Sequence, residues 1–147
     1  MTRQETIDFN LRWSWAKLVR LYSAEADRRG ITMSVGYALL SIEKEGTPST
    51  KLGPRMGMET TSLSRTLKRM EENGLIKRIP DSKDKRSVRV FLTSDGVEAR
   101  RQARDLVVGI NERLAAMLGH KTINELNVGL QKLNEILEDP EHLMPIQ

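Results

Sequence analysis

Residues 56–74 read MGMETTSLSRTLKRMEENG and contain a turn followed by a helix. Gly57 suits a tight turn because glycine tolerates backbone conformations that other residues avoid. The helix is predicted to begin at Glu59 or Thr60 and to end at Asn73-Gly74, because a glycine commonly stops a helix. The segment therefore supplies the second half of a helix, turn, helix arrangement.

The helix after the turn has two different faces. At 100° per residue, its apolar side comprises Leu63, Thr66, Leu67 and Met70, and its opposite, mostly basic side comprises Thr61, Arg65, Lys68, Arg69 and Glu72. A helix that reads the DNA major groove needs short hydroxyl residues near its N-terminus and arginines that bond guanine or phosphate. The candidate DNA contacts in this helix are Thr60, Thr61, Ser62, Ser64, Arg65, Lys68 and Arg69. The alternative is a solvated face on which Lys68 and Glu72 form an i,i+4 ion pair.

Two helices are predicted before the turn. Ser49 can cap a short helix that ends at Met56, and Thr32 can cap a longer helix that ends near Gly46. The apolar positions of the longer helix are Val35, Leu39, Leu40 and Ile42. Their helical spacing predicts a face buried in the core, so this helix has a structural role.

Two short strands are predicted after the helix. Residues 75–79 and 88–92 form β-prone runs, and the polar loop 80–87 joins them. The loop is longer than an ordinary hairpin turn, which gives it room to reach a neighbouring surface.

The loop between the strands is strongly charged. Lys83, Lys85 and Arg86 place three cations within four residues. We expect Lys85 and Arg86 to contact DNA, with Arg86 entering the minor groove where A·T-rich sequence concentrates negative potential. The alternative is a turn kept polar for solubility, in which Asp81 and Asp84 bond backbone amides and pair with Arg86.

Both ends of the chain are predicted to be helical. The first helix spans residues 6–29 and is apolar on more than one face, which favours one face for its own domain and another for a partner. A central core helix is the alternative. Thr93 can cap a long helix that ends at Gly119, and Thr122 with Glu125 makes a capping box for a last helix.

Composition limits the class of protein. The 147 residues suffice for one core and not for two ordinary domains. The formal charge of +4 is mild, so the position of the basic residues matters more than their excess. The chain has no cysteine, which excludes disulfides and thiolate zinc sites. It also lacks a signal peptide and an apolar run long enough to span a membrane, so we expect a cytoplasmic protein.

Several short motifs occur in a specific order between Leu52 and Gly96. They are Met56-Gly57, Thr61-Ser62-Leu63-Ser64-Arg65, Glu71-Glu72-Asn73-Gly74-Leu75-Ile76, the pattern D-x-x-D-x-R at Asp81, Asp84 and Arg86, and Leu92-Thr93-Ser94-Asp95-Gly96. Each motif is weak by itself, but their order and spacing together are specific. In this respect the chain resembles the MarR family of winged-helix transcription regulators, and the likeness extends over essentially its whole length.

The resemblance implies a fold and a function. The fold is mainly α with a small β-hairpin wing, and residues 1–147 make a single domain of six helices. Residues 32–93 would form the winged helix-turn-helix, while the helices at 6–29 and 94–138 would hold a homodimer. The implied function is sequence-specific binding of double-stranded DNA at a pseudo-palindromic operator, as a repressor or, alternatively, an activator of transcription.

The sequence departs from the family pattern in two places. Gly53-Pro54 lies inside the third helix, where proline removes an N–H group and strains the preceding turn. We therefore expect this helix to start late or to bend, which affects phosphate contacts at Ser49, Thr50 and Lys51. The second departure is the absence of cysteine, which excludes the oxidation-sensing branch of the family.

The resemblance also implies a pocket for a small effector. It would lie between the dimer-forming helices and the winged region, and an aromatic or anionic molecule bound there would release the protein from DNA. Trp13, Trp15 and Tyr37 are candidates to line it, although large aromatic residues at these positions fit the core or a dimer contact equally well.

Other chemistry is not indicated. His120 and His142 have no carboxylate or cysteine at ligand spacing, so we expect no metal and no cofactor. The chain shows no nucleophile with a base and no phosphate-binding glycine loop, which argues against an enzyme. A winged domain used only for protein–protein contact is the remaining alternative, and the basic face of the helix argues against it.

Overall fold

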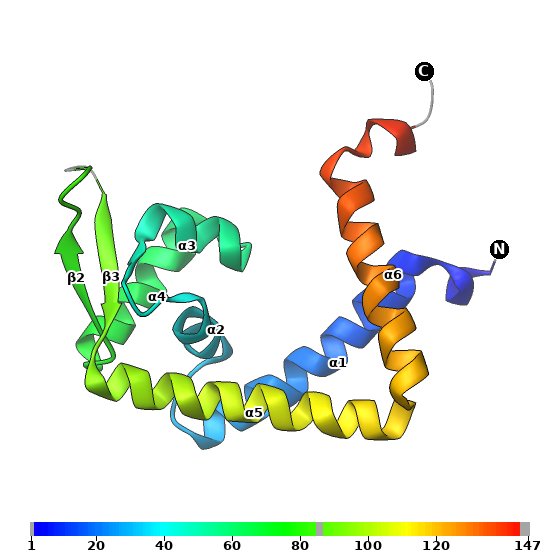
Figure 1. The fold of residues 1–147 in the computed structure, drawn as a ribbon, viewed down its shortest axis with the longest axis horizontal. Coiled ribbons are helices and arrows are strands. Elements are labelled where there is room, and N and C mark those ends of the chain that lie inside the picture. The colour runs from blue at the N-terminus through cyan, green and yellow to red at the C-terminus, as the bar shows by residue number, and fades with distance from the viewer. Residues whose placement is uncertain (1, 85–86, 145–147) are drawn as a thin grey trace. The chain divides into compact units, whose positions relative to one another are not determined.

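The structure is a computed structural model that describes residues 2–84 and 87–144 (Figure 1). The chain forms two compact units, Met1–Arg104 and Asp105–Gln147. The first unit holds the mixed helix and strand region, and the second holds the end of one long helix and the whole of another. Among the described residues, no helix has the length and apolar character needed to cross a membrane.

The elements are mostly helices. The α-helices are α1 Ile7–Arg28, α2 Met33–Ser41, α3 Ser49–Met56, α4 Thr60–Glu72, α5 Ser94–Leu118 and α6 His120–Glu138, with short 3-10 turns η1 Arg3–Glu5 and η2 Pro140–Leu143. The strands are β1 Thr47–Pro48, β2 Ile76–Pro80 and β3 Val88–Leu92. The described residues thus contain six α-helices and a small sheet, which confirms the predicted fold class.

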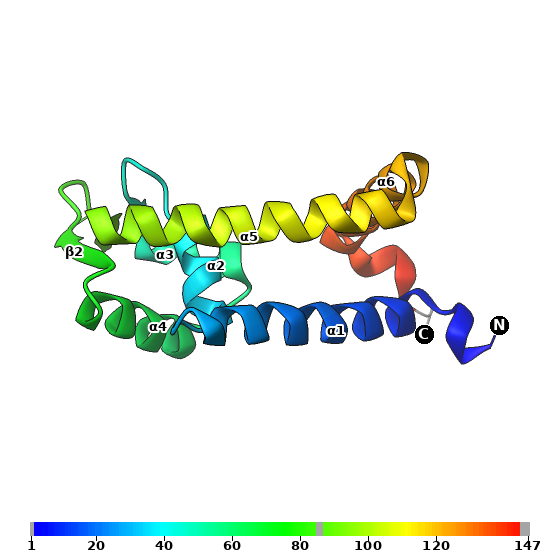
Figure 2. The same cartoon turned by 90° about the horizontal axis from the view of Figure 1, so that it is seen from below.

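Two of the four predicted N-cap residues are confirmed. The hydroxyl of Thr32 accepts a hydrogen bond from the amide of Val35, and that of Thr93 accepts one from Gly96. Ser49 and Thr122, in contrast, are not caps, because Pro48 and Gly119 occupy the N-cap positions of α3 and α6. Gly119 has φ 83°, a conformation that suits glycine, and the chain turns there from α5 into α6 (Figure 2), three residues before the predicted cap Thr122.

The late start predicted for the third helix is wrong. Helix α3 begins at Ser49, and Pro54 is its sixth residue. At that place proline removes only the N–H that would have bonded the carbonyl of Thr50, so the first turn still forms. The amide of Met58 donates to the carbonyl of Gly53 at 2.9 Å, and Gly57 has the left-handed conformation expected for the turn.

The sheet is antiparallel and has the strand order β1-β3-β2. In the hairpin, Ile76 lies opposite Leu92 and Pro80 lies opposite Val88. The sequence did not predict β1, whose Thr47 pairs with Val90. A strand of two residues has no period from which it can be recognised.

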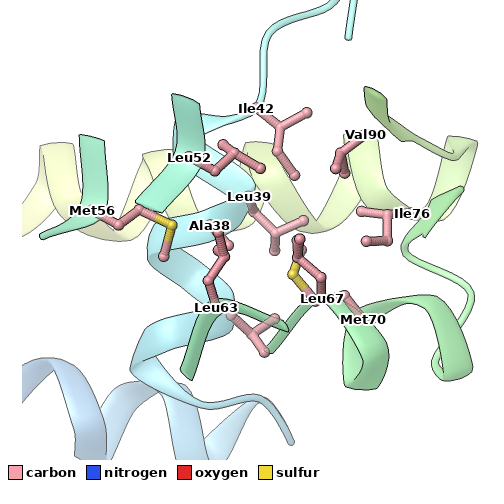
Figure 3. Packing of buried hydrophobic residues seen from close by; sticks show 11 residues of the cluster. Ala38, Leu39, Ile42, Leu52, Met56, Leu63, Leu67, Met70, Ile76 and Val90 are labelled. Carbon is pink, nitrogen blue, oxygen red and sulfur yellow. The ribbon is translucent and has the colours of Figure 1, made fainter. Parts of the chain in front are cut away.

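The core lies where α2, α3, α4 and the sheet meet (Figures 1 and 3). Its buried members are Val35, Ala38, Leu39, Ile42, Leu52, Met56, Leu63, Leu67, Met70, Ile76 and Val90. The predicted face of α2 is confirmed at Val35, Leu39 and Ile42, while Leu40 is half-buried. Because α2, α3, α4 and the sheet all contribute to the same core, packing against the other elements fixes the orientation of α4, and not only the turn that precedes it.

The terminal helices bury little within the chain. Ala26 is the buried residue of α1, and α6 has none. The exposed large apolar side chains are Ile7, Leu11, Trp13, Trp15 and Leu21 in α1, and Leu126, Val128, Ile136 and Leu137 in α6. These helices therefore present apolar surface of the kind that often marks an interaction site.

Candidate nucleic-acid interface

Helix α4 separates its two faces as the sequence predicted. Leu63, Leu67 and Met70 are buried in the core, with Thr66 half-buried beside them. All the candidate DNA contacts on this helix are exposed, namely Thr60, Thr61, Ser62, Ser64, Arg65, Lys68 and Arg69. The structure therefore presents these side chains together on the outer side of a helix whose inner side is anchored.

The N-terminus of α4 is suited to a negative ligand. Glu59 is the N-cap and makes no side-chain capping bond, and the first turn contains no acidic residue. The first amides of a helix have no partner within it, and the helix dipole is positive at this end. Exposed Thr60, Thr61 and Ser62 thus lie where a phosphate or a base edge can accept hydrogen bonds.

The basic residues of α4 are available for contacts. Lys68 lies 3.9 Å from Glu72, with side chains 71% and 63% exposed, so this ion pair exists but is weak. Arg65 and Arg69 have no carboxylate partner among the described residues. A guanidinium held on a helix without an internal partner can donate to guanine or phosphate.

The wing contains a fixed carboxylate. Oδ1 of Asp81 accepts a hydrogen bond from the amide of Lys83 at 2.8 Å, and Oδ2 lies 3.4 Å from Nη2 of Arg89. The amide of Lys83 first, and then the charge of Arg89, lower the pKa of Asp81. The predicted bonding of Asp81 to a backbone amide is thus confirmed, and its described cationic partner is Arg89. Lys85 and Arg86, the predicted DNA contacts of the wing, lie outside the described residues.

Arg78 is a residue near the interface that the sequence did not single out. Its Nε and Nη2 lie 2.9 Å and 2.5 Å from Oε2 of Glu71. These bonds lower the pKa of Glu71 and raise that of Arg78. The pair connects the last turn of α4 to β2, and the turn between these two elements brings the residues together. No spacing rule within one element could have found it.

A groove runs between α3, α4 and the hairpin. It encloses about 640 Å³ and is lined in part by Ser49, Thr60, Ser64 and Arg78. The groove contains hydroxyls from both helices and one cation from the sheet. It therefore extends the polar surface of α4 towards the wing.

The three aromatic candidates for an effector pocket have different neighbours. Trp13 stacks on Phe9 with ring centroids 6.2 Å apart, and Nζ of Lys17 lies 5.7 Å from the Trp13 ring. Trp15 is exposed on the same helix, and the hydroxyl of Tyr37 donates to the carbonyl of Arg55 at 3.4 Å. These contacts assign Trp13 to a surface stack and Tyr37 to the junction of α2 with α3.

The part of the chain that the structure describes contains no group of three or more histidine, aspartate or glutamate residues placed to hold a metal ion. The sequence has no cysteine that could add a thiolate.

Known proteins share this architecture. The family model described as "MarR family" matches residues 32–88. The organic hydroperoxide resistance transcriptional regulator of Bacillus subtilis (strain 168) is 31% identical over 117 residues, which cover 77% of this chain and 80% of the relative. A mutant MarR from E. coli complexed with operator DNA has a TM-score of 0.74 at 26% identity, covering 84% of this chain and 89% of that one.

The fold is also that of a more distant protein. The crystal structure of the S. aureus MepR–DNA complex has a TM-score of 0.79 at 17% identity and covers 88% of this chain and 97% of that one. The relatives are transcriptional regulators rather than enzymes. With a relative above 30% identity aligned over most of both chains, and a winged helix-turn-helix in the structure, the chain belongs to the MarR family of DNA-binding transcription regulators.

Proposed function

We propose that the protein is a repressor that binds a pseudo-palindromic operator in double-stranded DNA as a homodimer. The observation that carries this proposal is the division of α4 between a core face and an exposed face of hydroxyls and of arginines that have no carboxylate partner in the described part of the chain. Such a helix enters the major groove, while the wing of the same unit lies over the neighbouring minor groove. Its place of action would be the cytoplasm, in keeping with its proposed binding to DNA.

The candidate residues would have different roles in DNA recognition. Thr60, Thr61, Ser62, Ser64 and Arg65 lie in the first half of α4 and would reach base edges or the nearest phosphates. Lys68 and Arg69 lie further along the helix and would hold the phosphate backbone. Lys85 and Arg86 of the wing remain proposed contacts of the adjacent minor groove.

The proposed homodimer uses the ends of the chain. The exposed apolar side chains of α1, and separately those of α6, need a partner to leave water. Residues 6–29 and 94–138 would supply this interface, and residues 32–93 would read one half-site per copy. Two such copies require half-sites roughly 10 base pairs apart, or a multiple of that distance.

A small aromatic or anionic effector would act on the spacing of the two recognition helices. It can change DNA binding only through a difference in its affinity for the two spacings. The name of the B. subtilis relative refers to organic hydroperoxides. This chain has no cysteine, so oxidation of a thiol cannot be its signal.

Fluorescence anisotropy with DNA from upstream of the protein's own gene tests the proposal. Specific sites should bind at least about a thousandfold more tightly than random DNA, and affinity should fall steeply with salt. Sedimentation of the complex should give two copies per site. Equal competition by random DNA would instead favour a winged domain used for protein contact, and a single copy on an isolated half-site would contradict the dimer.

A further inference from the structure

Arg89 on β3 joins the wing to the loop that precedes β1. Its Nη1 donates to the carbonyl oxygen of Gly46 at 3.0 Å, and its Nη2 lies 3.4 Å from Oδ2 of Asp81. The side chains of Asp81 and Arg89 are only 7% and 31% exposed, so water competes weakly for these contacts. The guanidinium can satisfy both acceptors because it presents several donors in one fixed plane.

The Asp81 end of this bridge shapes the wing. The other carboxylate oxygen of Asp81 accepts from the amide of Lys83, and the amide of Asp81 donates to the carbonyl of Ser87 at 2.9 Å. Asp81 thus fixes the first turn after β2 while its charge is held by Arg89. The direction in which the loop leaves the hairpin depends on this carboxylate.

The Gly46 end of the bridge is anchored to the helix-turn-helix. A Cβ at Gly46 would lie 2.5 Å from the Phe91 ring, so the backbone there packs directly on β3. The amide of Gly46 donates to the carbonyl of Glu43 at 3.1 Å. Oε1 of Glu43 in turn lies 2.8 Å from Nη2 of Arg55 in α3, whose Nη1 donates to the carbonyl of Ser41. One loop therefore connects the wing, through Arg89, with α3, through Arg55.

We propose that Arg89 is a positioning residue for DNA recognition, which sets the wing relative to the helix-turn-helix and thereby determines the preference for the sequence flanking each half-site. The inference rests on the proposed function, since it requires a wing that reaches DNA. Its Nη1 and Nη2 already meet protein acceptors, so the proposed role of Arg89 is to position the wing rather than to contact DNA. Recognition of the half-site by α4 does not depend on Arg89, because the core and the ion pair of Glu71 with Arg78 hold α4 in place.

The test compares four DNA duplexes, with native or G·C-substituted flanks around a native or altered half-site. The variant Arg89→Met keeps the length of the side chain but removes both bonds. Lys44→Met is the control, because it removes an exposed cation from the loop before β1 that is neither a proposed DNA contact nor part of the proposed dimer interface. In Arg89→Met, the ratio of the affinities for native and substituted flanks should fall about tenfold, corresponding to the loss of charged hydrogen bonds. The ratio of the affinities for native and altered half-sites should not change. Lys44→Met should keep both kinds of discrimination.

Two further variants separate positioning from stability. Arg89→Lys keeps the charge but cannot reach both acceptors, and Asp81→Asn keeps the acceptor for Lys83 but loses the charge that faces Arg89. Both should lose flank discrimination selectively, even if Arg89→Met is too unstable to assay. Unchanged flank discrimination in these variants, or an equal loss at flanks and half-sites, would overturn the role of Arg89 alone. Wild-type protein without any sequence preference would overturn the proposed function, and the role of Arg89 with it.

Discussion

The hydroxyl of Thr93 lies 2.6 Å from the carbonyl oxygen of Gly74, to which it donates, and it also accepts the amide of Gly96 at 3.0 Å. The amide of Thr93 donates in addition to the carbonyl of Leu75 at 3.0 Å. One threonine therefore caps α5 and joins its first turn to the end of α4. The start of the long helix is fixed to the end of the recognition helix by hydrogen bonds rather than by a flexible linker.

Replacing Thr93 by valine should destabilise the protein by about 1–2 kcal/mol, because the cap of α5 and the bond to Gly74 are lost together. Thr122→Val is the matched control, since Thr122 lies inside α6 and caps nothing. Its effect should stay within about 0.5 kcal/mol. Urea unfolding followed by circular dichroism measures both values. Equal losses for the two variants would show that the bonds of Thr93 contribute nothing specific.

Gly96 should not tolerate a side chain. A Cβ at this position would lie 1.9 Å from the carbonyl oxygen of Leu75, and the backbone cannot yield without moving α5 away from the end of α4. Gly96→Ala should cost several kcal/mol, about as much as severe overpacking of a core. Gly109→Ala in the same helix meets nothing within 4 Å and should be neutral or stabilising by up to about 1 kcal/mol. Thermal unfolding of both variants decides the matter, and a stable Gly96→Ala protein would refute this close approach.

The fold could be predicted from sequence where periodicity is strong. The spacing of Leu63, Leu67 and Met70 gives the buried face of α4, and the strand 88–92 was predicted with its observed bounds. Prediction failed where residues outside a helix or strand determine where that helix or strand begins. The start of α3 is set by Pro48, which pairs with Arg89 in the sheet, and local capping preferences carry no information about such a pairing.

The candidate site also has features that could be predicted from the sequence and features that could not. Exposure of Arg65 and its neighbours follows from the helical period and could be predicted, whereas their contacts with DNA stay a prediction. The pairs Glu71 with Arg78 and Asp81 with Arg89 could not be found, because each joins residues from different elements. The turn between α4 and β2 brings the first pair together, and the hairpin brings the second pair together. The two pairs also show which cations near the wing already have a carboxylate partner.

Glu98 should have an unusually acidic carboxyl group. Hydrogen bonds from Arg101 and then Gln102 lower its pKa from 4.5 to about 2. A lowered pKa in the folded state means that this interaction stabilises the protein above pH 4.5 and is lost as the pH falls towards 2. Carboxyl-detected NMR titration should find Glu98 still ionised at pH 3, and Arg101→Ala should return its pKa towards the ordinary value. A normal titration of Glu98 in the unmodified protein would show that the ion pair on α5 does not persist in solution.

Arg65 and Lys68 should differ in what their loss does to DNA binding. Arg65 lies in the first half of α4 and has no ion-pair partner among residues 2–84 and 87–144, so Arg65→Ala should cost about 1–3 kcal/mol on the operator and relax the preference at one base pair. Lys68 lies one turn further along and near Glu72, so Lys68→Ala should weaken specific and random DNA alike and reduce the slope of affinity against salt by about one. Anisotropy titrations against the operator, single-base variants and random DNA at several salt concentrations separate the two effects. Sequence-independent losses of equal size for both variants would remove Arg65 from base recognition and leave it as a phosphate contact.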